Sequence, residues 1–350
     1  MPGPLEGIRI IELAGIGPAP FCGMMLADHG AEVVTVHRPG AAPLPRDPLN
    51  RSRLYFEANL KLAADLEKVK SLIASADGLI EGFRPGVLER LGLEPESLHK
   101  DNPKLVIGRM TGWGQTGPLA HAVGHDINYI SLSGALHAFG RDGEKPTPPI
   151  NTVGDFGGGG MLLAFAMCAA LLKAEKTGKG EVIDCAMTEG SSLLMSMVWG
   201  FMDYAGWKDE RGVNLLDTGA HFYDTYETSD GKYISFGSIE PQFYNEMLEL
   251  TGLMDNPEFK LQMDPKKWPS LKDRISEVIK TKTRDEWDTI MEGTDVCYAP
   301  VLSMAEAPNH QHNIARDAFI AVDGVNQPSP APKYAHSPLE RPRKPKPFGT

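Results

Sequence analysis

Two ionisable side chains beside glycine are the residues whose types could do chemistry in this chain. His125 lies in the segment Gly124–Asn128, and Asp155 lies between Gly154 and a run of four glycines at 157–160. Glycine lets the backbone turn sharply and lets another molecule approach closely. A base and an acid offered from separate turns suit an enzyme that removes one proton and returns another. Taken singly, each residue is more often a turn residue or a helix N-cap, so the pair carries the hypothesis.

A third acid, Glu240, stands between a predicted strand and a predicted helix. A carboxylate at a helix start complements the helix dipole and needs no further role. The functional alternative makes Glu240 a partner that orients a histidine and stabilises its charged form.

The glycine-rich segment 111–118 follows a predicted strand and carries Trp113 and Gln115. It should therefore lie at the carboxyl edge of the sheet, where open α/β folds bind ligands. A plain surface turn rarely contains tryptophan, since large apolar side chains are usually buried. We interpret this segment, which includes Gly117, as a ligand-contacting loop.

Several arginines near predicted strand ends form a candidate phosphate site, because guanidinium groups grip phosphates in a fork. For any single one of them, ordinary solvated charge is an equally good reading. They are Arg38, Arg51, Arg53, Arg84 and Arg90.

Four methionines occur in or near one predicted helix: Met187, Met195, Met197 and Met202. Flexible thioethers of this kind could line a surface that tolerates acyl chains of different length. Ordinary filling of a core explains them equally well.

The order of elements predicts an α/β fold. Ile8–Leu13 and Glu32–Val36 are strand-like and flank the helix-like segment Phe21–Asp28, so they form a β-α-β unit with parallel strands. The alternation continues with helices at 62–75 and 161–173 and with strands at 78–81, 105–110 and 181–186. We predict a doubly wound, Rossmann-like parallel sheet over about the first 185 residues.

The segment Gly15-x-Gly17 begins a dinucleotide-binding fingerprint, but Pro20 stands where the third glycine belongs. Pro18 also removes a backbone donor from the turn. The broken motif therefore points away from an NAD-dependent dehydrogenase.

A smaller α+β lobe is predicted after the parallel sheet. Two alternating segments, 221–226 and 232–236, meet at Asp230-Gly231 like antiparallel strands, and three helical patterns follow. From Gln327 the chain is dense in proline, which predicts an extended tail. The expected division is a large domain at 1–190 with 305–350 returning to it, a linker helix and crossing at 191–221, and a small domain at 222–304.

The composition of the 350 residues, with 41% hydrophobic and 23% charged, is ordinary for a globular protein in water. The net charge of −11 disfavours a nucleic-acid-coating surface, so an anionic ligand would need a local basic patch. The four cysteines are scattered without a CxxC pair, so we expect neither a disulfide framework nor a zinc site. We also expect no signal peptide and no membrane span, and hence a cytoplasmic protein.

Several of these segments together resemble the type III CoA-transferase family, and within it the α-methylacyl-CoA racemases. The resemblance covers roughly residues 1–325. The segments that carry it are 26–34 (LADHGAEVV), 82–87 (GFRPGV), 111–118 (TGWGQTGP), 124–129 (GHDINY), 154–158 (GDFGG) and 239–244 (IEPQFY). The first three would fit a transferase equally well, whereas His125 together with Glu240 is what a racemase implies.

The resemblance implies an interlocked homodimer with active sites between the large domain of one subunit and the small domain of the other. His125 and Asp155 would exchange the α-proton of an acyl-CoA thioester through an enolate, and Glu240 would reach His125 across the subunit boundary. No metal or redox cofactor is implied. The remaining implied contacts to acyl-CoA are Arg38, Arg51, Arg84, Arg90, Trp113, Gln115, Gly117, Asp126, Tyr129, Met187 and Met195.

Two other functions stay open on the sequence. A CoA transferase would use Asp155 as a nucleophile and pass CoA between carboxylic acids through an acyl anhydride. A CoA-binding regulatory protein would keep the fold and bind the ligand without turnover.

Overall fold

The structure is a computed structural model that describes residues 3–349, and it divides into two units. The first unit contains the residues up to 133, 149–195 and those from 314 onward, and the second contains 134–148 and 196–313. The division differs from the predicted domains in three places. Residues 134–148 group with the second unit, and the return to the first unit begins at 314 instead of 305. The predicted linker at 191–221 is divided, since the second unit already begins at 196.

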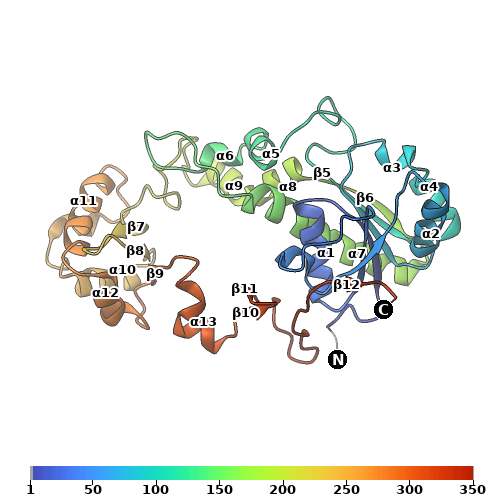
Figure 1. The fold of residues 1–350 in the computed structure, drawn as a ribbon. Helices are drawn as coiled ribbons and strands as arrows, with labels where there is room; N and C mark the ends of the chain where they lie inside the picture. The colour runs from blue at the N-terminus through green and yellow to red at the C-terminus, as the bar shows by residue number, and fades with distance from the viewer. Residues whose placement is uncertain (1–2, 350) are drawn as a thin grey trace. The chain divides into compact units, whose positions relative to one another are not determined.

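The first unit is built on one sheet of seven parallel strands: β1 (Arg9–Leu13), β2 (Glu32–His37), β3 (Leu54–Glu57), β4 (Gly78–Glu81), β5 (Val106–Thr111), β6 (Glu181–Ala186) and β12 (Lys346–Pro347). Their order across the sheet is β12-β3-β2-β1-β4-β5-β6, with every pair parallel. This is the doubly wound order, so the predicted α/β fold is confirmed (Figure 1).

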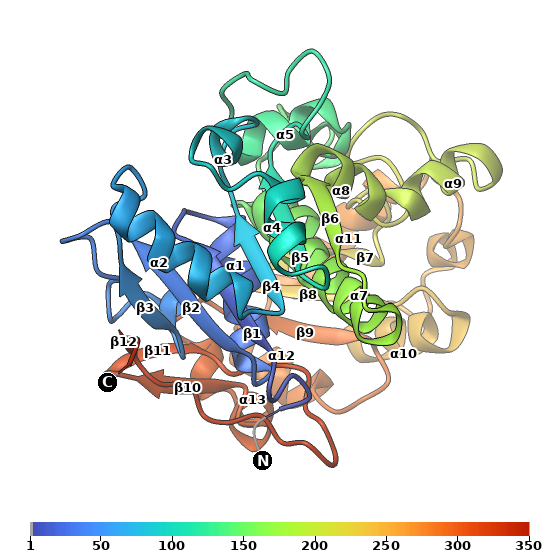
Figure 2. The same ribbon diagram turned by 90° about the vertical axis from the view of Figure 1, so that its right-hand side faces the viewer.

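Helices cover both faces of this sheet: α1 (Pro18–Asp28), α2 (Ala63–Ala74), α3 (Val87–Arg90), α4 (Pro95–Asp101), α5 (Asp126–Leu132), η2 (Thr152–Met161), α7 (Leu162–Thr177) and α8 (Met187–Leu194), with a short η1 (Pro48–Asn50) before β3. Because successive strand residues point to opposite faces, Ile10 joins one core and Ile11 the other. The first core packs α1 and α7 on the sheet, and the second packs α2, α3 and α4 on the opposite side (Figure 2).

The segment Thr152–Thr177 is the one described helix that is long and apolar enough to cross a membrane by length and composition. In the fold it is a core helix instead. Leu163 and Met167 of α7 are fully buried against β5 and β6, in the core that α1 shares. This packing accounts for the apolar residues on the inner face of the helix.

The glycine run at 157–160 is helical. It lies within the π-helical segment η2, which leads directly into α7. A Cβ atom on Gly190 of α8 would lie 1.9 Å from the carbonyl oxygen of Gly158, and one on Gly160 would lie 2.6 Å from that of Pro18. These glycines therefore serve the close packing of η2 against α1 and α8.

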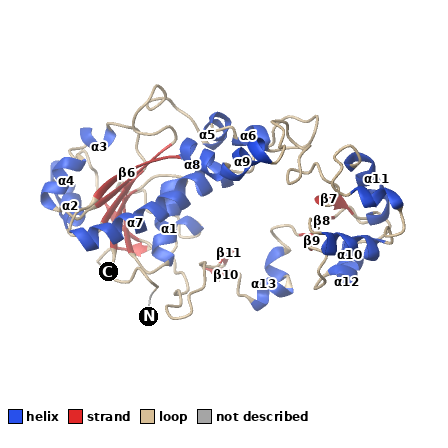
Figure 3. Cartoon of the chain, turned by 180° about the vertical axis from the view of Figure 1, so that it is seen from behind, coloured by secondary structure: helices blue, strands red, loops and turns tan. Residues whose placement is uncertain are grey.

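The second unit contains an antiparallel sheet and a helical layer (Figure 3). Strands β7 (Tyr223–Glu227), β8 (Tyr233–Gly237) and β9 (Tyr298–Val301) pair in that order, which confirms the predicted hairpin at Asp230-Gly231. Its helices are α6 (Ala135–Ala138), α9 (Ser196–Tyr204), α10 (Pro241–Thr251), η3 (Pro257–Leu261), α11 (Trp268–Ile279), α12 (Arg284–Met291) and η4 (Ala307–Asn309). In place of the single linker helix predicted at the start of 191–221, the chain has two helices, α8 (187–194) and α9, which meet at Met195.

The proline-rich tail is anchored to the first unit. Helix α13 (Gln311–Ala315) leads into a hairpin of β10 (Phe319–Val322) and β11 (Val325–Pro328), and β12 then pairs with β3. The pairing of β12 rests on two backbone bonds, from the N–H of Lys346 to Arg53 and from the N–H of Phe348 to Tyr55. The sequence analysis identified neither β3 nor these tail strands.

Arg53 and Arg51 brace this part of the sheet from inside. The guanidinium of Arg53, 1% exposed, pairs with the carboxylate of Glu12 and donates to Thr35 Oγ1 at 3.1 Å. Arg51, 4% exposed, pairs with Asp28 on α1 and donates to the Gln327 side chain at 3.0 Å. Both side chains are therefore occupied by protein partners. This contradicts the predicted phosphate contact of Arg51, since a buried fork that is already paired offers no donors to a ligand.

The ion pair of Glu12 and Arg53 allows us to measure how much stability is lost when a buried charge has no partner. Replacing Arg53→Met leaves Glu12 buried without its cation, so we expect the free energy of unfolding to fall by about 3–5 kcal/mol. Urea unfolding followed by circular dichroism measures it. The double variant Glu12→Met/Arg53→Met should regain most of the loss, and a double variant as unstable as the single one would contradict this account.

Candidate active site

A cavity of about 560 Å³ opens at the carboxyl edge of the parallel sheet. Its walls come from the turns after β1 (16–19), β4 (82–85) and β5 (112–113), together with the start of α5 and the first turn of η2. Strands β1 and β4 are neighbours whose following helices pack on opposite faces. The cavity thus lies at the topological switch point, where doubly wound folds bind ligands.

His125 is the N-cap residue of α5, and its side chain is exposed at the cavity. Its backbone N–H donates to the Asn128 side chain at 3.0 Å, and its carbonyl accepts the N–H of Asn128 at 2.8 Å. This cap fixes the backbone of His125 and places its side chain at the cavity.

Asp155 stands in the first turn of η2. Its carboxylate accepts a hydrogen bond from the Asn151 side chain at 2.8 Å, and its backbone N–H donates to the buried carboxylate of Asp126 at 2.8 Å. Burial raises the pKa of Asp155, the Asn151 bond opposes this, and Asp126 adds to the rise. The residue therefore holds a proton at a higher pH than an ordinary aspartate does.

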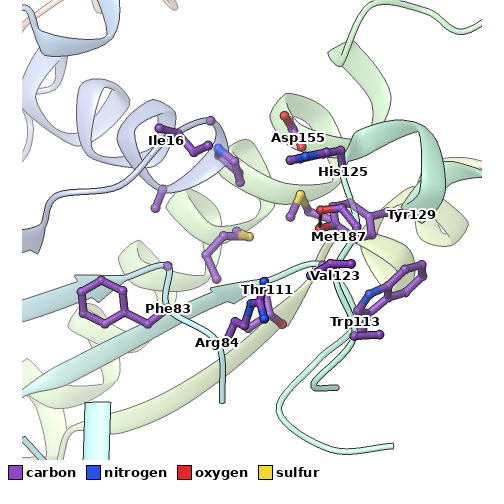
Figure 4. A pocket seen from close by; sticks show the side chains of 18 of the residues that line it. Ile16, Phe83, Arg84, Thr111, Trp113, Val123, His125, Tyr129, Asp155 and Met187 are labelled. Carbon is purple, nitrogen blue, oxygen red and sulfur yellow. Dashed lines mark hydrogen bonds between the residues drawn. The ribbon is translucent and has the colours of Figure 1, made fainter. Parts of the chain in front are cut away.

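Figure 4 shows the carboxylate of Asp155 and the imidazole of His125 next to each other at the cavity, close to Met187. The proximity has an electrostatic consequence, because the charge of His125 lowers the pKa of Asp155 against the larger effect of burial. An acid and a base thus meet at one cavity from two separate elements, which is the arrangement that proton transfer requires.

An aromatic pair fixes the loop beside His125. The rings of Trp113 and Tyr129 meet edge to face with 4.8 Å between centroids, and the hydroxyl of Tyr129 donates to the carbonyl of Gly124. A Cβ atom on Gly124 would lie 2.8 Å from the Tyr129 ring, so only glycine fits there. Trp113 and Tyr129 both line the cavity, as predicted contacts should.

The other predicted contacts divide into two groups. Arg84 and Met187 line the cavity. The predicted contacts that do not line it are Arg38, Arg51, Arg90, Gln115, Gly117, Asp126 and Met195. Of these, Arg38 is exposed after β2 and Arg90 is exposed at the end of α3.

Three of these have other visible roles. The backbone N–H of Gln115 donates to Asp184 at 3.0 Å, which anchors the loop to β6. Gly117 has φ +94, a left-handed turn position that favours glycine. Asp126 is buried and holds the backbone of Asp155.

Glu240 lies in the second unit, where it is the N-cap residue of α10 and is followed by Pro241. Its contact with His125 remains a prediction. Within residues 3–349 no group of three or more His, Cys, Asp and Glu side chains is arranged to hold a metal ion.

Asn151 is the site residue that the sequence analysis missed. Its backbone is left-handed, with φ 57, and its side chain reaches the carboxylate of Asp155 four residues later. The available signal was an asparagine, which tolerates this conformation, three residues before Gly154 and Asp155.

Three comparisons agree on the family. The model of CoA-transferase family III matches residues 5–349. A protein named alpha-methylacyl-CoA racemase from Mus musculus is 46% identical over 328 residues, which cover 94% of this chain and 85% of that protein. The protein of the same name from Homo sapiens is 42% identical over 335 residues, covering 95% and 87%. The crystal structure of a CAIB/BAIF family protein from Brucella suis superposes with a TM-score of 0.86 at 25% identity, covering 99% of this chain and 97% of that one.

The Asn151 bond has a measurable electrostatic effect. Its donated hydrogen bond favours the charged carboxylate, so the substitution Asn151→Ala should raise the pKa of Asp155 further. NMR titration of the protein labelled with ¹³C at the aspartate carboxyl carbons measures this. Asn309→Ala, which removes a side-chain bond to Ala305 in the second unit, serves as the control and should leave the Asp155 titration in place. A lower pKa in Asn151→Ala would reject the assigned role.

Proposed function

The chain belongs to CoA-transferase family III, and on that premise we propose that it is a racemase that interconverts the (R) and (S) forms of 2-methylacyl-CoA thioesters. The observation that carries the proposal is the meeting of His125 and Asp155 at one cavity on the switch point of the sheet. Identity of 42–46% to alpha-methylacyl-CoA racemases over most of the chain supports the reaction class.

The proposed reaction is a proton exchange at the carbon beside the thioester carbonyl. In one direction His125 takes the α-proton to give an enolate, and protonated Asp155 delivers its proton to the opposite face of that carbon. In the reverse direction carboxylate and imidazolium exchange these tasks, so protons balance in both. The raised pKa of Asp155 supports this, since it brings the acid and the base closer in proton affinity.

The enolate oxygen needs hydrogen-bond donors. The backbone N–H of Asp155 is taken by the carboxylate of Asp126. The first turn of α5, directly after His125, offers the N–H groups of Asp126 and Ile127, which have no acceptor within the helix. A donor aimed at a developing oxyanion typically contributes about 3–4 kcal/mol.

The substrate would span polar and apolar walls. Arg84 lines the cavity, and Arg38 and Arg90 stand at the same edge of the sheet, where they would meet the CoA phosphates. Met110, Met187 and Ile16 form an apolar wall for the acyl group. We expect no metal or redox cofactor, because the two side chains supply the whole proton exchange, and a cytoplasmic location.

Glu240 requires a second subunit in this proposal. Three large apolar side chains form an exposed stripe that runs from the end of η2 along α7: Met161 at 51%, Phe165 at 72% and Leu172 at 57%. Apolar surface at this spacing on one helix face is typical of an interface. We infer a homodimer in which the partner's second unit brings a Glu240 to His125.

The transferase alternative uses the same cavity with Asp155 as nucleophile. It gains no support from His125, which that chemistry leaves without a task. Supplying a carboxylic acid as acceptor and searching for a new thioester distinguishes the two reactions.

The reaction can be tested by isotope exchange. A single enantiomer of a 2-methylacyl-CoA in deuterated water should yield both epimers with deuterium at the α-carbon. His125→Ala and Asp155→Ala should each lose at least about 100-fold in rate, because general acid–base catalysis typically contributes that much. His336→Ala, an exposed tail histidine, is the control. Unlabelled and unepimerised substrate from folded protein that still binds CoA would reject the racemase and leave a binding protein.

The homodimer can be tested with Phe165→Glu, which buries a charge in the inferred interface. We expect a monomer by light scattering and a loss of racemase activity, since the partner's Glu240 would be missing. Lys68→Glu, exposed on α2, which packs on the opposite face of the sheet from α7, is the control and should stay dimeric. Chains carrying His125→Ala and Glu240→Ala, each inactive alone, should regain activity when co-expressed. If they stay inactive, Glu240 does not act across the boundary.

A further inference from the structure

We propose that Arg109 is a positioning residue for the arginines that meet the CoA nucleotide, acting through Glu81 and Glu89. The inference rests on the proposed function, since it assumes a ligand that carries the CoA phosphates. It concerns residues that none of the motifs above contains.

Glu81, Arg109 and Glu89 form a bridge of ion pairs, and its first half joins two neighbouring strands. Glu81 is the last residue of β4 and lies opposite Arg109 of β5 in the parallel register. Both are buried, with Glu81 at 0% and Arg109 at 7% exposure, and the Nε–H of Arg109 donates to Glu81 Oε1 at 2.8 Å. The second carboxylate oxygen accepts the backbone N–H of Phe83 at 2.6 Å. One carboxylate therefore ties β5 to the turn that follows β4.

The second half of the bridge reaches helix α3. The two terminal nitrogens of Arg109 donate to the two carboxylate oxygens of Glu89, at 2.8 and 3.3 Å. A forked pair of this kind fixes orientation as well as distance. Its hydrogen bonds lower the pKa of Glu89 although burial opposes them, so Glu89 is ionised at neutral pH. One guanidinium thus holds both ends of the segment 81–89.

That segment carries the cations of the proposed nucleotide site. Residues 82–85 form one wall of the cavity, and Arg84 is exposed at the centre of the turn. Arg90 directly follows Glu89, and its guanidinium lies against Gly86, 3.2 Å from the place of a Cβ atom. Neither Arg84 nor Arg90 forms an ion pair with any residue in 3–349. Two unpaired guanidinium groups on a braced element of a protein with net charge −11 are suited to an anionic ligand.

The burial of the three side chains decides which of them can be replaced without unfolding the protein. Removing Arg109 would leave the fully buried Glu81 uncompensated and would endanger folding. Glu89→Gln is milder, because the Glu89 side chain is 37% exposed and the amide still accepts one bond. The second unit offers a matched control in Glu306→Gln. There Arg284 pairs in the same forked way with Glu306, at side-chain exposures of 7% and 35%, against 9% and 37% for Arg109 and Glu89.

The experiment compares two substrates that share an acyl group. For the 2-methylacyl-CoA, Glu89→Gln should raise KM about tenfold with kcat unchanged, the usual effect of losing one charge-assisted hydrogen bond at a binding element. For the matching pantetheine thioester, which lacks the nucleotide, KM should not change. Glu306→Gln should leave the KM of both substrates unchanged. In an Arg84→Ala/Arg90→Ala background, Glu89→Gln should have no further effect on KM.

Calorimetric titration with CoA alone separates this inference from the reaction. Glu89→Gln should weaken CoA binding by a similar factor, whether or not the wild type exchanges α-protons. If the wild type binds CoA but exchanges no proton, the racemase proposal is rejected. The Kd of Glu89→Gln for CoA still tests the positioning role of the bridge. Equal KM changes with both substrates, a fall in kcat, or an unaltered Kd for CoA would overturn the positioning role.

Discussion

The contact between η2 and α8 is the constraint on which the site depends. Asp155 lies in the first turn of a π-helical segment, and the three glycines that follow Gly157 allow that segment to approach α1 and α8 at backbone distance. A side chain on Gly158 or Gly190 would push these elements apart and would move Asp155 away from His125. Packing far inside the unit thereby decides whether an acid and a base meet. The same four-glycine run, seen in the sequence, was interpreted as a place for a ligand to approach.

Charge is used in two ways in the first unit. Buried arginines such as Arg51, Arg53 and Arg109 are matched with carboxylates and join elements that are distant in the sequence. Exposed arginines at the carboxyl edge, Arg84 among them, have no carboxylate partner within the described residues. Burial distinguishes an arginine that joins elements inside the unit from a cation that a ligand can reach.

The sequence predicted most of the sheet and the central acid–base pair, and the reasons are physical. Strands such as β1 and β5 are rich in apolar residues because both of their faces are covered, and this pattern is local. Strand β3 was missed because its four residues are only half-buried and its partner β12 comes almost 300 residues later. Arg51 was misassigned for the same reason, since its partners Asp28 and Gln327 are brought together only by the fold. Asn151 escaped notice because its role lies in one hydrogen bond.

The pairing of β12 with β3 closes one edge of the parallel sheet. β3 has its outer backbone groups satisfied only when Lys346 and Phe348 lie beside it. Without them the first unit would present an open strand edge next to an otherwise formed sheet, and such edges recruit foreign strands. Pro347 of β12 has no backbone N–H to donate, so the new outer edge is a poor template for a further strand. The tail therefore protects this side of the sheet from edge-to-edge association.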